Sequence, residues 1–403
     1  MLETVKRELK NLKSPLYRNS IYISLSSLTT AVAGFVFWAV AARLYPAGDV
    51  GVASAVVSAL NLTFNLSMLG MNIALIRFYP EYKEKAVGNA LLLGTLASVV
   101  FSSIYGLVML QNNSVSSIPP RFLIVFVLFS TAGVAYNVLS TYAIAKRKAE
   151  HSFAQSVLFS LRFIFLFLLI PFGVMGIVSS FGLGLLLGLA YGLLVLDGVR
   201  LSVDGEFLKK ALRFSLGNYV ASIASMAPNY LMPTIVLTML GNEEAAYFYM
   251  AFTIGNLILF VPNAINTSFF VEGSHGLKNL RRTLKKALAF SYIYMVFAAI
   301  GVWLFGGFVL RFFGEEYVEG FGLLKLMVLG GFFVVVVNFA ITILNIQKRV
   351  KEVVMINTLK AVLFLGLSYI LVPRFGIEGV GWGWIGAYLG VLGVLSLFAR
   401  EEA

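Results

Sequence analysis

The chain has 403 residues, of which 59% are hydrophobic and 12% are charged, and its mean hydropathy is +0.88. This composition excludes an ordinary soluble domain and indicates a membrane protein. The absence of cysteine excludes disulfides and thiolate metal sites, and two histidines are too few for a histidine metal cluster, so no cofactor is expected.

Twelve apolar stretches follow one another along the chain, and each approaches or exceeds the roughly 20 residues that a helix needs to cross a bilayer. They are 19–42, 50–76, 87–110, 122–145, 152–170, 174–196, 214–238, 246–271, 287–310, 321–346, 353–372 and 377–399. Because these runs lack the period-two alternation of barrel strands, they predict helices. The expected fold is therefore an all-α integral membrane protein with twelve transmembrane helices.

The net charge of +12 is distributed unevenly between the loops. With the N-terminus inside, the cytoplasmic segments hold 24 of the 31 lysines and arginines, whereas the opposite loops hold four. This bias predicts a multi-pass protein of the cell membrane with both termini in the cytoplasm. The basic charge then reflects topology and does not indicate a nucleic-acid partner. Residues 1–18 are expected to form an amphipathic segment on the inner membrane surface.

The second half of the sequence repeats parts of the first. The heptad PFGVMGI at 171–177 returns as RFGIEGV at 374–380, an offset of 203. Five further pairs follow at offsets of 195 or 201: Arg18 and Arg213, Asp49 and Glu244, Asn61 and Asn256, Asn137 and Asn338, and Thr141 and Thr342. Because six spans preserve orientation, we predict a parallel repeat of two six-helix lobes. The expected domains are the segment 1–18, the lobe 19–196, the linker 197–213, the lobe 214–399 and the tail 400–403.

Three cations lie inside the predicted spans, whereas no Asp or Glu lies at depth in a span, since Glu378 stands at the very start of the last one. Arg162 is near the midplane, where an unpaired charge costs at least about 2.5–3.5 kcal/mol. Two interpretations remain open, namely that Arg162 faces a ligand or cavity, or that it bonds to helix carbonyls. Lys325 and Lys360 lie nearer to span ends, so they either snorkel to the surface or face the ligand. The missing carboxylates argue against a simple proton antiporter.

Amides form a second polar pattern. Asn61 and Asn65 share one face of span two, and Asn256 and Asn263 share one face of span eight. Span seven adds Asn218, Asn229 and Tyr230. The alternative to a binding role is ordinary hydrogen bonding between helices. The equivalent stripes on equivalent spans favour a hydrated central cavity between the lobes.

Prolines interrupt the same two spans, Pro228 and Pro233 in span seven and Pro262 in span eight. Proline inside a helix removes a hydrogen bond and kinks it. These kinks predict a bending gate, although many membrane helices are kinked without moving.

Two blocks of sequence resemble a known family. The run FWAVAARLYPAGDVGVASA at 37–55 and the run LGMNIALIRFYP at 69–80 resemble polysaccharide biosynthesis proteins of the oligosaccharide-lipid flippase kind, and 375–383 is similar to their last hairpin. The resemblance implies the multidrug/oligosaccharidyl-lipid/polysaccharide exporter superfamily, whose lobes open alternately to each side. In that superfamily spans one, two, seven and eight line the cavity. The chain lacks the charged first span of peptidoglycan-precursor flippases and the buried acid of cation-coupled extruders.

The resemblance implies a flippase that moves a polyprenyl-phosphate- or pyrophosphate-linked oligosaccharide from the inner to the outer leaflet for cell-surface polysaccharide or glycoconjugate assembly. Arg162, with Lys360 as second choice, would attract the phosphate, and asparagines would bond sugar hydroxyls. The expected substrate-binding residues are Arg162, Lys360, Lys325, Asn61, Asn65, Asn256, Asn263, Asn218, Asn229, Tyr230, Asn137 and Asn338.

The expected partners are the lipid-linked oligosaccharide, membrane lipids, and glycan polymerase or ligase machinery. Because the transfer needs no covalent chemistry, the chain is not expected to be an enzyme. Two alternatives remain open. One is an exporter of amphipathic small molecules on the same fold, and the other is a polytopic membrane glycosyltransferase.

Overall fold

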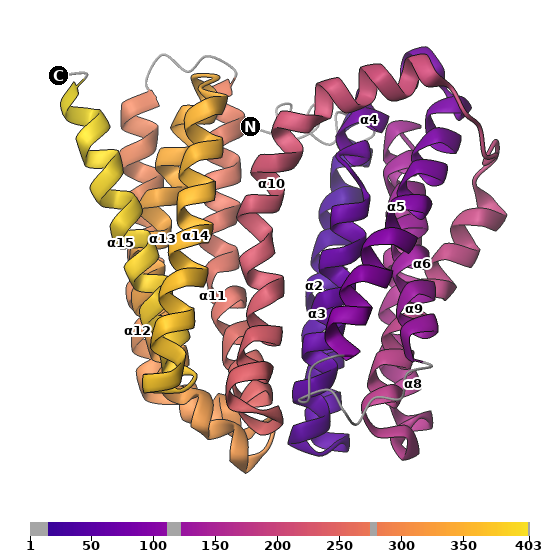
Figure 1. Cartoon of the computed structure of the whole chain (residues 1–403). Helices are drawn as coiled ribbons and strands as arrows, with labels where there is room; N and C mark the ends of the chain where they lie inside the picture. Colours follow the sequence, from indigo (N-terminus) through magenta and orange to yellow (C-terminus); the bar gives the residue numbers. More distant parts are fainter. Residues whose placement is uncertain (1–14, 111–121, 275–279, 402–403) are drawn as a thin grey trace, which may run out of the picture. The chain divides into compact units, whose positions relative to one another are not determined.

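The computed structural model describes residues 15–110, 122–274 and 280–401 (Figure 1). The predicted amphipathic segment 1–18 falls almost entirely outside these ranges. The regular structure in the described ranges is helical, with twelve spans that are long and apolar enough to cross a membrane. These spans coincide with the twelve apolar stretches, so the prediction of an all-α membrane protein is confirmed.

Two compact units divide the chain. One comprises the described residues up to Tyr45 together with Val56–Tyr219, and the other comprises Pro46–Ala55 and the residues from Val220 onwards. One division falls between α2 and α3, and the other two fall inside the helices α3 and α10. The predicted lobe boundaries around the linker 197–213 remain a prediction.

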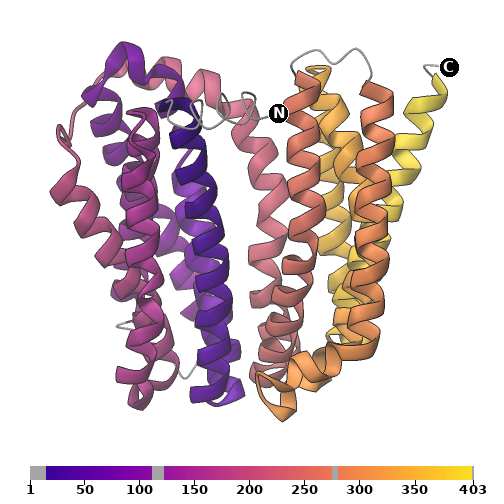
Figure 2. The ribbon, with the colours of Figure 1, turned by 180° about the vertical axis from the view of Figure 1, so that it is seen from behind.

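The first unit contains the helices from α2 to α9, apart from the start of α3 up to Ala55. They are α2 (Pro15–Leu44), α3 (Ala47–Ser67), α4 (Met71–Tyr82), α5 (Glu84–Leu110), α6 (Phe122–Ala145), α7 (Ala149–Ser160), α8 (Arg162–Leu168), the 3₁₀ turn η2 (Ile170–Phe172) and α9 (Gly173–Val195). Within this unit α2 packs against α7 and α8, and α6 packs against α5 and α9 (Figure 2).

The second unit contains the remaining spans. Besides the start of α3, up to Ala55, it contains the part of α10 (Gly205–Leu240) from Val220 onwards. Its other elements are α11 (Asn242–Ser274), α12 (Leu280–Arg311), the 3₁₀ turn η3 (Glu315–Gly320), α13 (Phe321–Ile346), α14 (Val350–Phe375) and α15 (Glu378–Glu401). Within this unit α15 packs against α13 and α14, and α11 packs against α12 and α13.

Two predicted spans are each built from two helices. The span at 50–76 breaks between α3 and α4, where Leu69 and Gly70 have φ angles of 47° and 76°. The span at 152–170 breaks at Leu161, between α7 and α8. A side chain at Gly70 would lie 2.5 Å from the Cβ of Ser215, so glycine allows α10 to approach closely.

The sequence repeat has a counterpart in local geometry. The turn after α6 and the turn after α13 each contain a basic residue in the left-handed conformation, Arg147 at φ 59° and Lys348 at φ 60°. Each turn is closed by three backbone bonds, whose donors and acceptors in the second turn are the residues 201 positions after those in the first. The glycines of the repeated heptad, Gly173 and Gly376, likewise share φ angles of 52° and 57°.

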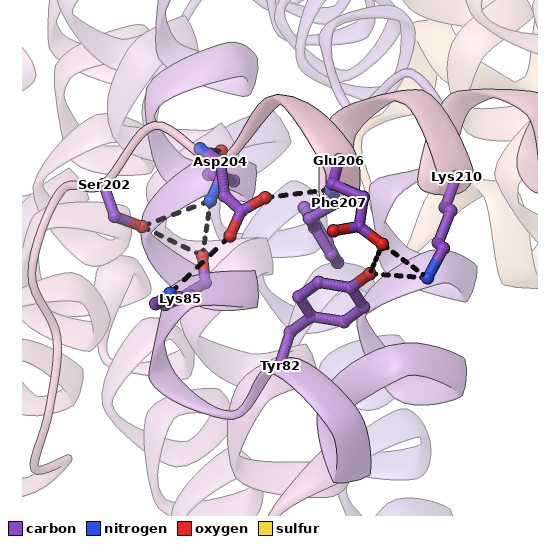
Figure 3. A network of polar contacts seen from close by, with 8 residues as sticks. Tyr82, Lys85, Ser202, Asp204, Glu206, Phe207 and Lys210 are labelled. Carbon is purple, nitrogen blue, oxygen red and sulfur yellow. Dashed lines mark hydrogen bonds and ion pairs between the residues drawn. The ribbon is translucent and has the colours of Figure 1, made fainter.

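The segment between α9 and α10 packs on the first unit (Figure 3). The amide of Asn89 donates to Lys85 O and Ser202 Oγ at 2.8 and 3.2 Å, and its oxygen accepts from Asp204 N at 2.8 Å. Asp204 in turn caps α10, because its Oδ1 accepts from Phe207 N at 3.1 Å.

The first turns of α10 continue this attachment. Lys210 lies 2.9 Å from Glu206 and 3.3 Å from Glu81, and it donates to the hydroxyl of Tyr82 at 2.8 Å (Figure 3). These bonds raise the pKa of Lys210 above its ordinary value, and the lysine lowers the pKa of Glu206. The beginning of α10 is thus held on the first unit by a polar network.

Candidate binding site

A polar pocket lies inside the second unit. Its volume is about 200 Å³. The walls come from α10, α11, α13, α14 and α15. The lining residues are Ser225, Pro228, Asn229, Asn256, Leu259, Asn263, Val334, Asn338, Lys360, Ala361, Phe364, Trp384 and Tyr388.

Lys360 brings the charge of this pocket. It lies on α14 beside the buried residues Asn357, Ala361 and Phe364, which follow one another at helical spacing on the packed face. Its Nζ donates to Asn357 Oδ1 at 3.2 Å and lies 5.7 Å from the ring centre of Tyr388. The ammonium group therefore points into the unit and not to the membrane surface, as snorkelling would require.

Amides from three helices surround the pocket. The Nδ2 of Asn338 donates to the Oδ1 of Asn263 at 3.0 Å, which joins α13 to α11. Asn256 lies on α11, seven residues before Asn263, and Asn229 adds a further amide from α10. These amides supply both donors and acceptors.

The opposite wall is aromatic. Trp384 and Tyr388 are one turn apart on α15, and their rings meet edge to face with centres 5.7 Å apart. Both side chains are buried. The pocket thus combines one ammonium, several amides and an aromatic surface, and no carboxylate is among its lining residues. Such a site fits a ligand that is anionic, rich in hydrogen-bonding groups and partly apolar.

The structure places the second midspan cation, Arg162, in the first unit. Its guanidinium carbon lies 3.8 Å from the ring centre of Phe159 and 5.3 Å from those of Phe37 and Phe181. The residue is 4% exposed. A Cβ built at Gly34 would lie 3.5 Å from its Nη2, an ordinary van der Waals distance, so Gly34 lies beside the guanidinium. A ligand role for Arg162 remains a prediction.

Several other predicted residues bond within their own helices. Asn61 donates to Val57 O at 2.8 Å, and Asn65 donates to Asn61 O at 2.7 Å. Asn137 donates to Gly133 O at 2.8 Å. Their binding roles also remain predictions.

Of the remaining predicted residues, Pro228 lines the pocket, whereas Lys325, Tyr230, Pro233 and Pro262 are not among its lining residues. Lys325 places its Nζ 3.9 Å from the ring centre of Phe321. Tyr230 is half-buried, and the side chain of Asn218 falls outside the described part of the chain. All three prolines lie inside continuous helices, with Pro228 beside the pocket. Their action as a gate remains a prediction.

Five predicted residues therefore meet in one pocket, namely Lys360, Asn229, Asn256, Asn263 and Asn338. Sequence reasoning missed the aromatic wall of Trp384 and Tyr388 and the support that Asn357 gives to Lys360. The signal for the wall was available, because aromatic residues four positions apart share a helix face. In an apolar span, however, such a pair is also typical of ordinary packing.

Comparisons with known proteins agree with the family resemblance that the sequence shows. Residues 16–270, more than half of the chain, match the family model described as "Polysaccharide biosynthesis protein". Over 169 residues the chain is 24% identical to a Shigella flexneri protein named "Putative O-antigen transporter". That match covers 41% of this chain and 40% of the relative, so the chain spans about two fifths of the length of this curated relative.

Solved structures share the fold. A lipid II flippase in an inward closed conformation has a TM-score of 0.76 at 16% identity, covering 94% of this chain and 87% of that chain. An inward-facing multidrug resistance transporter of the MATE family and MOP superfamily has a TM-score of 0.72 at 16% identity, covering 95% and 98%. At such identities the likeness shows the fold alone. The expected family and the expected transporter fold are both confirmed.

Proposed function

We propose that this chain, which belongs to the polysaccharide biosynthesis protein family, is a flippase for a polyprenyl-phosphate- or pyrophosphate-linked oligosaccharide, moving it from the inner to the outer leaflet. The observation that carries the proposal is the pocket around Lys360, with one ammonium, several amides and no carboxylate among its lining residues. The flippase and transporter named among the fold relatives support it.

In this proposal the headgroup enters the pocket while the lipid tail stays in the bilayer. Lys360 attracts the phosphate, because a charge-assisted hydrogen bond is roughly twice as strong as a neutral one. The amides of Asn256, Asn263 and Asn338 bond sugar hydroxyls. The transfer changes only the leaflet, so the chain needs no group that makes or breaks a covalent bond.

The proposal extends to location and partners. The loop charge bias supports a cytoplasmic-membrane protein with both termini in the cytoplasm. The family description supports a place in cell-surface polysaccharide assembly, beside glycan polymerase or ligase machinery.

A second candidate function is the export of amphipathic small molecules. The likeness to the multidrug resistance transporter favours it, because that likeness covers 95% of this chain. The two functions are separated by comparing flipping of a lipid-linked oligosaccharide with export of an amphipathic dye in the same proteoliposomes. Dye export without flipping would favour the exporter.

The test of the flippase uses reconstituted protein and a fluorescent polyprenyl-pyrophosphate-linked oligosaccharide. Flipping is scored by loss of fluorescence to an external quencher, normalised to folded protein. Lys360→Gln should slow flipping about 10- to 100-fold, because hydrogen bonds to charged groups contribute about 1.5–3 kcal/mol. Lys360→Arg should keep part of the rate.

Lys351→Gln is the matched control, since Lys351 is an exposed lysine on the same helix and does not line the pocket. It should flip normally. A well-folded Lys360→Gln protein that flips at the natural rate would remove the pocket from the proposal.

A further inference from the structure

We infer that the pocket of the second unit binds a single sugar residue that carries an anionic group, as the recognised part of the transported headgroup. The inference rests on the proposed function and narrows it. The shared chemistry is a pyranose ring joined to a phosphate or a carboxylate. The anion comes either from the lipid phosphate or from an acidic sugar.

Size limits the ligand. The pocket holds about 200 Å³, whereas sites for drug-sized ligands hold roughly 300–1,000 Å³. The pocket is therefore smaller than a site for a drug-sized molecule. One sugar ring is of this size, and an oligosaccharide is much larger. The rest of the glycan must therefore lie outside the pocket.

Charge selects an anion. The Nζ of Lys360 is oriented by Asn357 Oδ1 at 3.2 Å, a neutral acceptor that leaves the positive charge uncompensated. The lining residues include no carboxylate. Because a cation at membrane depth is costly, an anionic ligand gains from meeting it there.

Shape and polarity select a sugar over a bare anion. The bond from Asn338 Nδ2 to Asn263 Oδ1 leaves the other hydrogen-bonding groups of this amide pair available to hydroxyls. Trp384 and Tyr388 present apolar rings on another wall. A pyranose has hydroxyls at its rim and C–H groups on its faces, so it matches both walls.

The repeat assigns this recognition to the second unit. At the offset of 195, Asn229 corresponds to Gly34 and Asn263 to Met68, and at the offset of 203 Trp384 corresponds to Phe181. In the first unit Gly34 and Phe181 lie beside the guanidinium of Arg162. Two of the four lining amides, Asn229 and Asn263, thus correspond to residues without a polar side chain in the first half, whereas Asn256 and Asn338 correspond to Asn61 and Asn137. In the first unit Asn61 and Asn137 donate to carbonyls of their own helices.

Binding can be measured at the pocket itself. The chain has four tryptophans, so replacing Trp38, Trp303 and Trp382 by Phe leaves Trp384 as the only reporter. Its fluorescence is titrated in nanodiscs with four probes: glucose 1-phosphate, glucuronate, glucose and inorganic phosphate. Equilibrium dialysis of the same radiolabelled probes against the natural chain gives a second measurement that does not depend on these substitutions.

We expect glucose 1-phosphate or glucuronate to bind at least tenfold more tightly than glucose and than inorganic phosphate. Lys360→Gln should remove the advantage over glucose, and Lys351→Gln should leave it unchanged. Preference for glucose 1-phosphate identifies the lipid phosphate as the anion, and preference for glucuronate identifies an acidic sugar.

Equal binding of glucose and the charged probes would overturn the inference, as would stronger binding of inorganic phosphate than of either charged sugar. Flipping measured on the same protein separates the two proposals. Flipping without saturable probe binding overturns the inference alone. Saturable binding without flipping overturns the flippase and leaves the pocket assignment standing.

Discussion

The attachment of the linker to the first unit depends on one buried amide. Asn89 is 1% exposed and makes three hydrogen bonds, of which two join α5 to the segment before α10 and one stays within α5. Replacing it by alanine removes all three. The N–H of Asp204, which donates to the amide oxygen at 2.8 Å, then loses its acceptor on α5.

The cost follows from these contacts. Each of the two bonds that reach the segment contributes about 0.5–1.5 kcal/mol, which gives a range of roughly 1–3 kcal/mol. The lower half applies, because Ser202 Oγ still donates to Lys85 O at 3.0 Å after the substitution. A loss of about 1–2 kcal/mol in local stability corresponds to about 5- to 30-fold faster exchange of the Asp204 amide.

Hydrogen exchange followed by mass spectrometry on peptides covering 197–210 measures this change in nanodiscs. Asn89→Asp is the informative control, since its carboxylate oxygen still accepts from Asp204 N. It should therefore protect that amide better than alanine does. If Asn89→Ala speeds exchange less than about threefold, the amide does not hold the linker.

Three further outcomes are expected. Gly383→Ala should lower the stability by about 1–3 kcal/mol, because the new methyl would lie 2.8 Å from Ser368 N. Gly393→Ala should be tolerated, because its methyl would meet nothing within 4 Å. Equal thermal unfolding of the two variants would contradict the packing argument. Lys210 lowers the pKa of Glu206 from its ordinary 4.5. The protection of linker amides from hydrogen exchange, corrected for the intrinsic exchange rate, should therefore be constant above about pH 5 and decline as the pH falls through the lowered value. Unchanged protection at pH 3 would argue against a role for this pair. Asn242→Cys, in a chain without natural cysteine, should react with an impermeant maleimide on intact cells, and labelling only after permeabilisation would reverse the orientation.

The spans could be predicted from the sequence because crossing a membrane is a local property of length and polarity. All twelve stretches became helices. The breaks at Leu69–Gly70 and Leu161 could not be predicted, since both lie inside apolar runs long enough to be one continuous helix. Whether such a run bends depends on which helices pack against it, and hydropathy carries no information about that.

The pocket was partly predictable for a related reason. Spacing puts Asn256 and Asn263 on one face of span eight, and the repeat singles out Asn338, but neither shows which way a face turns. Asn65, four residues after Asn61, also shares a helix face with it, yet its amide bonds to its own helix. For Lys360, depth alone favoured snorkelling, and only the packing of α14 against α15 directs it inward.

Because the turns repeat, each position in one half of this chain can be compared with its equivalent in the other half. Where the halves agree, as in the left-handed conformation of Arg147 and Lys348, a non-glycine residue has kept a costly backbone shape twice. Where they differ, as at Gly34 and Asn229, only one copy carries a polar side chain. In a duplicated chain, a binding group that is needed only once has to be present in only one half. Positions at which the halves differ in polarity therefore indicate which half binds the ligand.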